Sequence, residues 1–265
     1  MVIVLERRND LRDDFELIVH RFDREKSAIR IYPIGDAHIG SGCLNKDFMD
    51  RWRNEVAMDD DGYIVIVGDM VENGLKNSKT NSYDAMMRPR EQKTALKEFL
   101  EPVAHKILGA VTGNHEYRSV NQTDDCPLYD VMCKLDVEDL YRENMAFLKL
   151  SLGKKNKERQ YTYTLALGHG AGRNKTENFS YSMDGLDVFV TGHTHQPGNR
   201  FPSKIVIDCQ NEQVRMQDFT HVTIPSFQKL GGYALRGMYM PQSSEKYPVI
   251  HLYGNEKKVD VLWTS

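Results

Sequence analysis

Short apolar runs rich in β-branched residues recur along the first part of the chain, and each ends at a glycine followed by polar side chains. Runs of this length, bounded by glycine, are typical of buried strands. Because the carboxyl ends of the strands in an α/β sheet form a ligand crevice, we expect the polar residues to share one rim. The predicted strands are residues 29–34, 63–67, 107–112, 163–167 and 188–191.

Segments with helical spacing separate several of these runs. Apolar residues recur every three to four positions in 46–58, 90–106 and the shorter segment 127–135. The alternation of strands and helices predicts an α/β fold. Beyond residue 195 strand-like runs follow one another with few helices, and we expect them to complete a second sheet packed on the first. These runs are residues 204–208, 221–224, 249–253 and 258–263.

Composition and charge narrow the class of protein. The chain has 265 residues, of which 40% are apolar and 28% charged, which suits one globular domain spanning residues 1–265. A net charge of −3 gives no global positive field, so a non-specific nucleic-acid coat protein is not expected. The charge does not argue against an enzyme whose metal ions neutralise a substrate phosphate.

Other features bear on the cellular compartment. No apolar run reaches the length of about 18 residues that a membrane helix needs, and residues 1–14 lack the apolar segment of a signal peptide. The four cysteines are scattered without a C-x-x-C pair, so we interpret them as reduced thiols. The sequence therefore predicts a cytoplasmic protein without a membrane partner.

The polar residues after the predicted strands are nitrogen and oxygen donors that suit Mn, Fe or Zn. In D-x-H and H-x-H segments, an extended chain would point both donors to one face. Seven donors are too many for one tetrahedral zinc ion and fit two ions that share a carboxylate. Two ions about 3.5–4 Å apart can clamp a phosphate and activate water. The candidate ligands are Asp36, His38, Asp69, Asn114, His169, His193 and His195.

Five sequence blocks carry a family resemblance: G-D-A-H at 35–38, G-D-M-V-E at 68–72, G-N-H-E at 113–116, G-H-G at 168–170 and G-H-T-H at 192–195. With these blocks the chain resembles the calcineurin-like metallophosphoesterase superfamily. The resemblance implies two mixed β-sheets sandwiched between helices. The G-H-T-H block looks like the phosphodiesterase and repair-nuclease branches, and the segment from 73 onward resembles stand-alone bacterial and phage-type members.

The resemblance also implies a role for each matched residue. His115 would face the scissile bond and either protonate the leaving oxygen or stabilise developing charge. Glu72 stands where many relatives carry an aspartate that orients this histidine. Arg118 lies three residues after His115, outside the matched blocks, and its chemistry is interpreted either as a bidentate phosphate contact or as that of a surface arginine. One metal ion would be held by Asp36, His38 and His195 and the other by Asn114, His169 and His193, with Asp69 bridging the two.

Three functions follow as hypotheses. The first is hydrolysis of a phosphodiester, in a nucleotide or nucleic acid, by a hydroxide that bridges two divalent ions. Manganese is the first choice for the ions, with Fe, Zn or Ni as alternatives. The second hypothesis is a phosphomonoesterase acting on nucleotides or phosphoproteins, and the third is a non-catalytic metal-binding scaffold. A homo-oligomer is compatible with the resemblance, although the sequence shows no clear exposed apolar stripe.

Several further residues are expected to have structural rather than catalytic roles. His20, His105 and His251 are expected to be structural or exposed, and His221 to lie away from the rim. Residues 73–90 either border the site or form a solvated connection. Asn81, Tyr83 and the stretch 230–234 are weak candidates for a substrate cleft, with a plain turn favoured for the glycines of that stretch.

Overall fold

The apolar runs pair into two six-stranded sheets and a separate two-stranded ribbon over the residues that the structure describes, 14–75, 78, 85–238, 240 and 245–264. In this computed structural model the first sheet has the order β14-β13-β2-β3-β4-β5. Its strands are β2 (Ala28–Ile34), β3 (Gly62–Ile66), β4 (Ile107–Val111), β5 (Tyr141–Arg142), β13 (Pro248–Tyr253) and β14 (Val259–Trp263).

The second sheet has the order β1-β6-β7-β8-β12-β9. Its strands are β1 (Ile18–Arg21), β6 (Met145–Leu152), β7 (Tyr161–Gly168), β8 (Val188–Thr191), β9 (Gly198–Arg200) and β12 (Thr220–Thr223). In the first sheet β2, β3, β4 and β5 run parallel, and in the second β7, β8 and β12 do. Parallel strands place their carboxyl ends at one edge, so each sheet delivers the residues that follow these strands to the same side.

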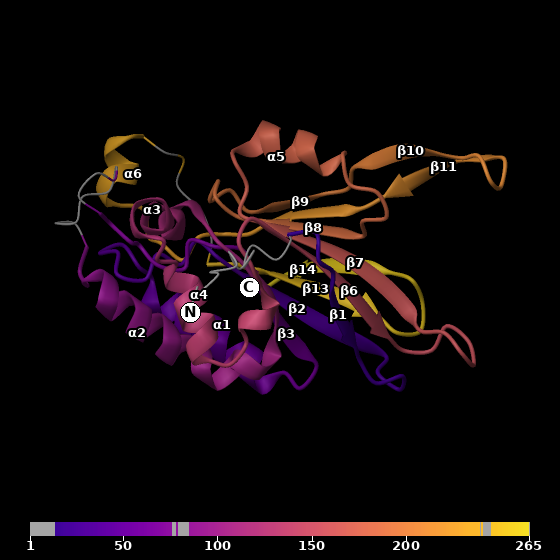
Figure 1. Ribbon diagram of the computed structural model, residues 1–265, viewed down its shortest axis with the longest axis horizontal. Coiled ribbons are helices and arrows are strands. Elements are labelled where there is room, and N and C mark those ends of the chain that lie inside the picture. Colours follow the sequence, from indigo (N-terminus) through magenta and orange to yellow (C-terminus); the bar gives the residue numbers. More distant parts are fainter. Residues whose placement is uncertain (1–13, 76–77, 79–84, 239, 241–244, 265) are drawn as a thin grey trace, which may run out of the picture.

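Helices cover the outer faces of this sandwich (Figure 1). On the first sheet, a core that includes Trp52, Leu96 and Val131 joins α1, α2 and α4 to the strands. The short helix α5 lies over the second sheet. The helical segments are α1 (Lys46–Met58), α2 (Pro89–Leu100), α3 (Asn114–Thr123), α4 (Pro127–Lys134), α5 (Arg173–Ser180) and α6 (Gly232–Arg236), with 3-10 turns at Glu101–Lys106 and Glu138–Leu140.

A second core lies between the two sheets. Ile31 and Val65 of the first sheet belong to the same buried cluster as Leu148 and Leu165 of the second. All four side chains are fully buried, and burial of each stabilises the fold by about 1.5–3 kcal/mol. This contact fixes one sheet against the other, and it therefore sets the distance between the two groups of strand ends.

The predicted α/β sandwich is confirmed, and the expected strands and helices appear within a few residues of the predicted bounds. The segment 90–106 divides into α2 and a 3-10 turn, because Pro102 at the start of that turn has no N–H to continue the helical hydrogen bonds. The strands of the tail were assigned wrongly to one sheet. Of the four predicted runs only β12 joins the second sheet, whereas β13 and β14 extend the first through pairing of β13 with β2.

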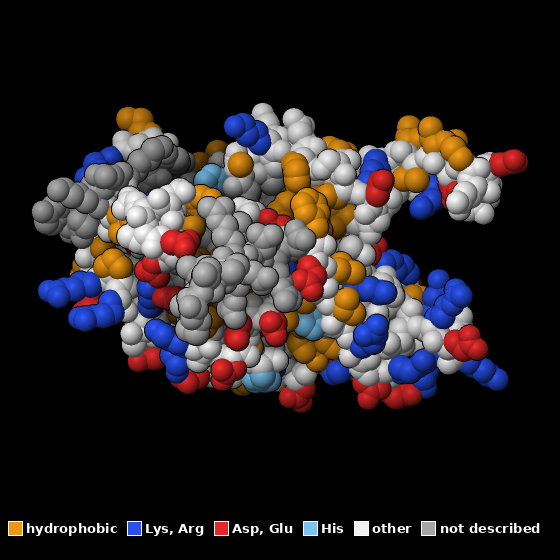
Figure 2. All heavy atoms as spheres, viewed as in Figure 1, with side chains coloured by type: hydrophobic (Ala, Val, Ile, Leu, Met, Phe, Trp, Pro, Cys, Tyr) orange, Lys and Arg blue, Asp and Glu red, His pale blue; other side chains and the backbone are white. Residues whose placement is uncertain are grey.

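The remaining tail segment forms the ribbon of β10 (Ser203–Asp208) and β11 (Gln213–Asp218), which projects from the body of the molecule (Figure 1). Ile205 pairs with Met216, and Ile207 pairs with Val214. All four side chains are exposed, and Figure 2 shows hydrophobic atoms along the ribbon. The structure thus contains an exposed apolar stripe that the sequence analysis did not find, since the alternation of residues does not show which face is covered.

Two findings concern the compartment hypotheses. Among the described residues, no helix is both long enough and apolar enough to cross a membrane. The cysteines at positions 43, 126, 133 and 209 are all free thiols.

Asp59 follows α1 directly and links the end of this helix to side chains of β2. One of its carboxylate oxygens accepts hydrogen bonds from Arg30 Nε at 2.5 Å and from the Tyr32 hydroxyl at 2.8 Å. Burial alone would raise the pKa of Asp59, but these bonds outweigh it and lower the pKa to about 2. We expect Asp59→Asn to lower the free energy of unfolding at pH 7 by about 1–3 kcal/mol, measured by urea denaturation.

The pH dependence of the free energy of unfolding provides a second check on Asp59. A carboxyl whose pKa is depressed by folding stabilises the protein above its ordinary pKa of 3.8, and the contribution is lost as the pH falls towards about 2. The unfolding difference between Asp59→Asn and the unaltered chain should therefore shrink below about pH 4. The exposed neighbour Asp60 provides the matched control, and an equal loss in Asp60→Asn would contradict this role for Asp59.

Candidate metal centre

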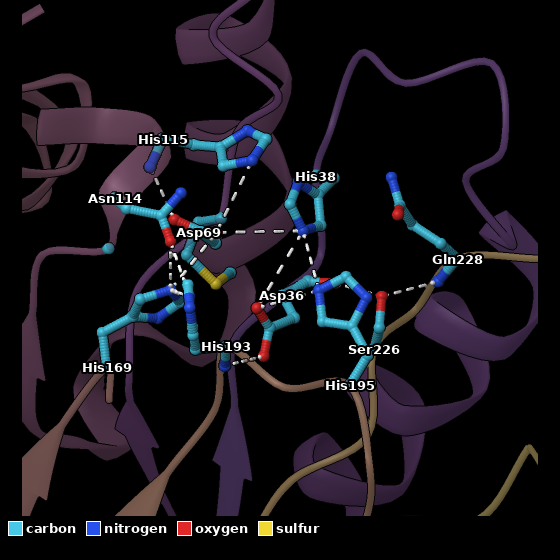
Figure 3. Close-up of polar contacts among 12 residues, drawn as sticks. Asp36, His38, Asp69, Asn114, His115, His169, His193, His195, Ser226 and Gln228 are labelled. Atoms are coloured by element: carbon cyan, nitrogen blue, oxygen red, sulfur yellow. Dashed lines mark hydrogen bonds and ion pairs between the residues drawn. The ribbon is translucent and has the colours of Figure 1, made fainter. Parts of the chain in front are cut away.

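The polar residues that follow five strands converge at one edge of the sandwich (Figure 3). Asp36 and His38 follow β2, and Asp69 follows β3. The other donors come from the start of α3 after β4, from the end of β7 and from the loop after β8. The structure brings together all seven sequence-predicted ligands and His115, in one cluster of side chains: Asp36, His38, Asp69, Asn114, His115, His169, His193 and His195.

Turns rather than strand alternation produce this convergence. Asp36 has a φ of 47° and His38 a φ of 50°, and His193 and His195 have φ values of 67° and 54°. These residues therefore lie in the left-handed region, which is unfavourable for every residue except glycine. The interpretation of D-x-H and H-x-H as extended segments was wrong, although both donors of each pair reach the cluster.

Two glycines allow the chain to pass close to Asp69. A Cβ atom on Gly68 would lie 2.3 Å from the backbone nitrogen of Gly113, and a Cβ on Gly113 would lie 2.2 Å from Asp69 Oδ1. Neither separation is sterically allowed, so both positions require glycine. The close packing of these two loops is what brings the ends of β3 and β4 into a single site.

Asp36, His38 and His195 form the first group of donor atoms. His38 Nε2 lies 3.3 Å from His195 Nε2, and Asp36 Oδ1 lies 3.2 Å from His195 Nε2 and 3.9 Å from His38 Nε2. Asp36 is fully buried, and its Oδ1 has no hydrogen-bond donor among the described residues. Its other oxygen, Oδ2, accepts a hydrogen bond from the His193 backbone N–H at 2.8 Å. One carboxylate oxygen is thus held by the backbone while the other faces two imidazole nitrogens.

Asn114, His169 and His193 form the second group. Asn114 Oδ1 lies 3.0 Å from His169 Nε2 and 2.7 Å from His193 Nδ1, and these two nitrogens are 3.2 Å apart. His169 Nδ1 donates to the carbonyl oxygen of Val67 at 2.7 Å, which leaves its Nε2 directed into the group. The bond from the ring to a backbone carbonyl is the arrangement that commonly orients a metal-binding histidine.

Asp69 lies between the two groups. Its Oδ2 is 3.3 Å from His169 Nε2 in the second group and 4.0 Å from His38 Nε2 in the first. Burial alone would raise the pKa of Asp69, but the surrounding histidines, His169 first, hold it well below its usual range. In turn the pKa of His169 is raised to about 10, because Asp69 and Asp36 outweigh the opposing effect of burial. The carboxylate is therefore strongly anionic at the centre of the cluster.

The donor set fits divalent ions. Ligands at about 2.0–2.2 Å from one ion lie roughly 3–3.5 Å from one another, and most of the contacts above fall in that range. The donors are carboxylate, amide and imidazole groups without a thiolate, and this set suits Mn, Fe or Zn. Three overlapping triads of described residues satisfy the geometry of a metal site: Asp36 with His38 and His195, His38 with Asp69 and His115, and Asp36 with Asp69 and His169.

His115 is oriented by a backbone carbonyl. Its Nδ1 donates to the Glu72 carbonyl oxygen at 2.6 Å, and its Nε2 lies 3.7 Å from Asp69 Oδ2. The Glu72 carboxylate is 3.9 Å from His115 Nδ1 but only 3.2 Å from His38 Nδ1. Arg118 Nη1 donates to the same Glu72 carbonyl at 3.2 Å. Glu72 therefore touches two histidines of the cluster, through different atoms.

Glu116 was quoted in the G-N-H-E block but given no role. It is fully buried, and its Oε2 accepts hydrogen bonds from the backbone N–H groups of Asp69 at 2.9 Å and Gly113 at 3.0 Å. Its Oε1 accepts from Met70 at 2.7 Å and Val71 at 3.2 Å. The sequence did contain a signal for this role, because a glutamate at the third position of a helix commonly accepts a hydrogen bond from the N-cap backbone.

The other sequence interpretations have mixed outcomes. His221 was expected away from the rim, but it is a buried residue of β12 that lines a cavity beside His195, because β12 pairs with β8. The glycines of the stretch 230–234 do not form a plain turn: Gly232 begins the short helix α6. Asn81 and Tyr83 lie outside the described residues.

Comparisons with known proteins complete the description. No curated protein matches the chain. Among solved structures, Vps29 from Cryptosporidium parvum is 15% identical, covers 90% of this chain and 98% of its own, and has a TM-score of 0.42. Calcineurin-like phosphoesterase YfkN from Bacillus subtilis is 10% identical (89% and 90% covered, TM-score 0.43), and nuclease MPE from Pseudomonas putida is 17% identical (88% and 87% covered, TM-score 0.35). Similarities this low support no inference about the reaction.

The match to a family model is more informative, because it covers the strands and loops that build the cluster. The model for calcineurin-like phosphoesterases matches residues 29–197, from β2 to just beyond His195. This stretch is more than half of the chain and contains every residue of the candidate metal centre. The chain therefore belongs to the calcineurin-like phosphoesterase family.

Proposed function

We propose that this protein hydrolyses a phosphodiester in a nucleotide or nucleic acid with the help of two divalent metal ions. The position of Asp69 carries the proposal. A single buried carboxylate oxygen lies within 4.0 Å of a nitrogen in each of two donor groups. This is the arrangement needed to bridge two ions, and the family of this chain acts on phosphate esters.

We propose that the ligands divide between the two groups in the way that the family resemblance implies. Asp36, His38 and His195 would hold one ion, and Asn114, His169 and His193 the other, with Asp69 shared. When bound, two such ions activate water at neutral pH and neutralise charge on the phosphoryl oxygens. We propose manganese as the ion because the donors are imidazole, carboxylate and amide groups, with Fe, Zn or Ni as alternatives.

His115 would act on the leaving oxygen. Burial first, and then the neighbouring His38, lower its pKa to about 4, so the ring is neutral near pH 7. With its proton on Nδ1, bonded to the Glu72 carbonyl, the Nε2 atom carries a lone pair. It can donate only after taking a second proton, and the negative charge of a bound phosphate favours that step. We propose that His115 either protonates the leaving oxygen, as a general acid that takes up its proton with the substrate, or stabilises the charge that develops on that oxygen.

Glu72 and Arg118 would support this machinery. The Glu72 carboxylate faces His38 Nδ1, on the side of the ring opposite the donor group, so we propose that it orients His38. Arg118 bonds to the carbonyl that holds His115. A guanidinium has five N–H donors in a fixed fork, and we propose that others of its donors contact a phosphate oxygen.

Hydrolysis of bis-p-nitrophenyl phosphate with Mn²⁺, beside p-nitrophenyl phosphate, tests the proposal. We expect the diester to be the better substrate and two metal ions per chain to be bound. Asp69→Asn should lower turnover by about 10³-fold or more because it removes the shared charge. His115→Ala should lower kcat by about 10²–10⁴-fold while it retains bound metal.

The exposed histidine His105 provides the control, and His105→Ala should keep the full rate. A preference for the monoester would replace the diesterase by a phosphomonoesterase. Substoichiometric metal together with no turnover on either ester would support the scaffold hypothesis instead.

The position of Glu72 generates a separate prediction. Loss of a carboxylate that orients a metal-binding histidine typically weakens metal affinity about 10–100-fold. We expect Glu72→Gln to raise the Mn²⁺ concentration for half-maximal activity by this factor, with a smaller change in kcat at saturating metal. The exposed Glu98 on α2 is the control position. An unchanged metal requirement with a shifted pH profile would show instead that Glu72 acts on His115.

A further inference from the structure

A cavity of about 460 Å³ opens beside His195, on the part of the surface formed by β8, β9, β12 and the start of α5. His195 belongs both to this cavity and to the first group of metal donors. Its neighbours in the G-H-T-H block, Gly192 and Thr194, also line the cavity. A molecule bound there would therefore be next to a phosphate held at the metal centre, because the imidazole of His195 borders both sites.

The charge of the cavity favours an anion. Arg173 and Arg200 line it, and no aspartate or glutamate does so among the described residues. Arg200 forms an ion pair with Glu177 of α5, whereas no ion pair of Arg173 is found in the described part of the chain. His221 is the cross-strand partner of Arg200, and its Nε2 lies 2.8 Å from Thr191 Oγ1. Burial lowers the pKa of His221 to about 4, so the ring adds no charge near pH 7. The protein as a whole carries a charge of −3, so this is a local positive site.

The remaining lining is rich in hydrogen-bonding groups. Four of the lining residues carry hydroxyl or amide side chains: Thr194, Gln196, Asn199 and Thr223. Asn199 Oδ1 accepts from Trp263 Nε1 at 3.3 Å, which fixes the amide and leaves its N–H₂ group to donate. Two imidazole rings lie on the wall. His195 is a candidate metal donor, and His221 is already stacked on Phe189 with ring centroids 4.9 Å apart. The cavity therefore suits phosphate and sugar oxygens better than a stacked base.

We propose that this cavity binds the phosphate and sugar of the nucleotide next to the scissile phosphodiester, with Arg173 as the principal phosphate contact. The substrate is then a nucleotide chain rather than an isolated small diester. This inference rests on the proposed function and narrows its substrate class. Direct contacts to the backbone phosphate position a nucleic acid without reading its sequence, so cleavage should show little base preference.

The test compares Arg173→Ala with the unaltered protein on two substrates in Mn²⁺: bis-p-nitrophenyl phosphate and a single-stranded thymidine tetranucleotide. We expect the ratio of kcat/KM for the tetranucleotide to that for the small diester to fall at least about 5–10-fold, as loss of one charge-assisted phosphate contact implies. Lys175→Ala removes the same charge from the exposed surface of the same helix, outside the cavity, and should leave the ratio unchanged. Arg173→Lys should recover part of the loss.

A binding measurement separates this inference from the proposed reaction. Fluorescence anisotropy of a labelled thymidine tetranucleotide is recorded with Asp69→Asn, alone and combined with Arg173→Ala or Lys175→Ala. The proposal for the cavity is supported if adding Arg173→Ala to Asp69→Asn lowers the affinity fivefold or more while adding Lys175→Ala does not. Equal effects of the two substitutions, or none, would overturn it, even if the small diester is hydrolysed. If the unaltered protein hydrolyses neither ester but Arg173 selectively affects binding, the proposed reaction fails and the cavity stands.

Discussion

The buried carboxylate of Glu116 holds the candidate site together. It accepts four backbone N–H groups, three from the loop after β3 and one from Gly113 before α3. These loops follow different strands and would otherwise leave their backbone donors unpaired in the interior, at a cost of about 1–3 kcal/mol each. By satisfying them together, one side chain fixes Asp69 relative to Asn114 and His115. The metal donors are thus positioned by a group that is not itself a donor.

Electrostatics place the cluster under opposing demands. Asp36 and Asp69 are both buried, and the histidines around them are the principal groups that compensate their charge. The same burial keeps His115 neutral, although it lies 3.7 Å from Asp69 Oδ2. The imidazoles of one cluster therefore differ widely in basicity, since the pKa of His169 is raised to about 10 while the pKa of His115 is lowered to about 4. The negative charge of Asp69 and Asp36 that raises the pKa of His169 favours a cation at that position, whether a proton or a metal ion, whereas burial keeps His115 neutral.

Much of the site was predictable from the sequence because each donor follows a strand and a glycine. The apolar runs predicted the strands, and their ends predicted that the polar residues share one rim. The division of these residues into two groups came from the family resemblance. The local backbone was not predictable in the same way. Nothing in D-x-H distinguishes an extended chain from the left-handed turns at Asp36 and His38, since tertiary contacts such as the Asp36 N–H to Gly68 carbonyl bond impose them. The partner sheet of each tail strand was equally hidden, because β12 and β13 have similar apolar patterns.

The left-handed residues set the stability of the backbone against the supply of donor atoms. Asp36, His38, Asp69, His193 and His195 all occupy backbone conformations that glycine would adopt with less strain, by on the order of 1 kcal/mol for each. Glycine at any one of these positions would relax the backbone and at the same time remove a candidate metal donor. The conformation that aims these five side chains at the site is thus one that side chains of their kind make less stable.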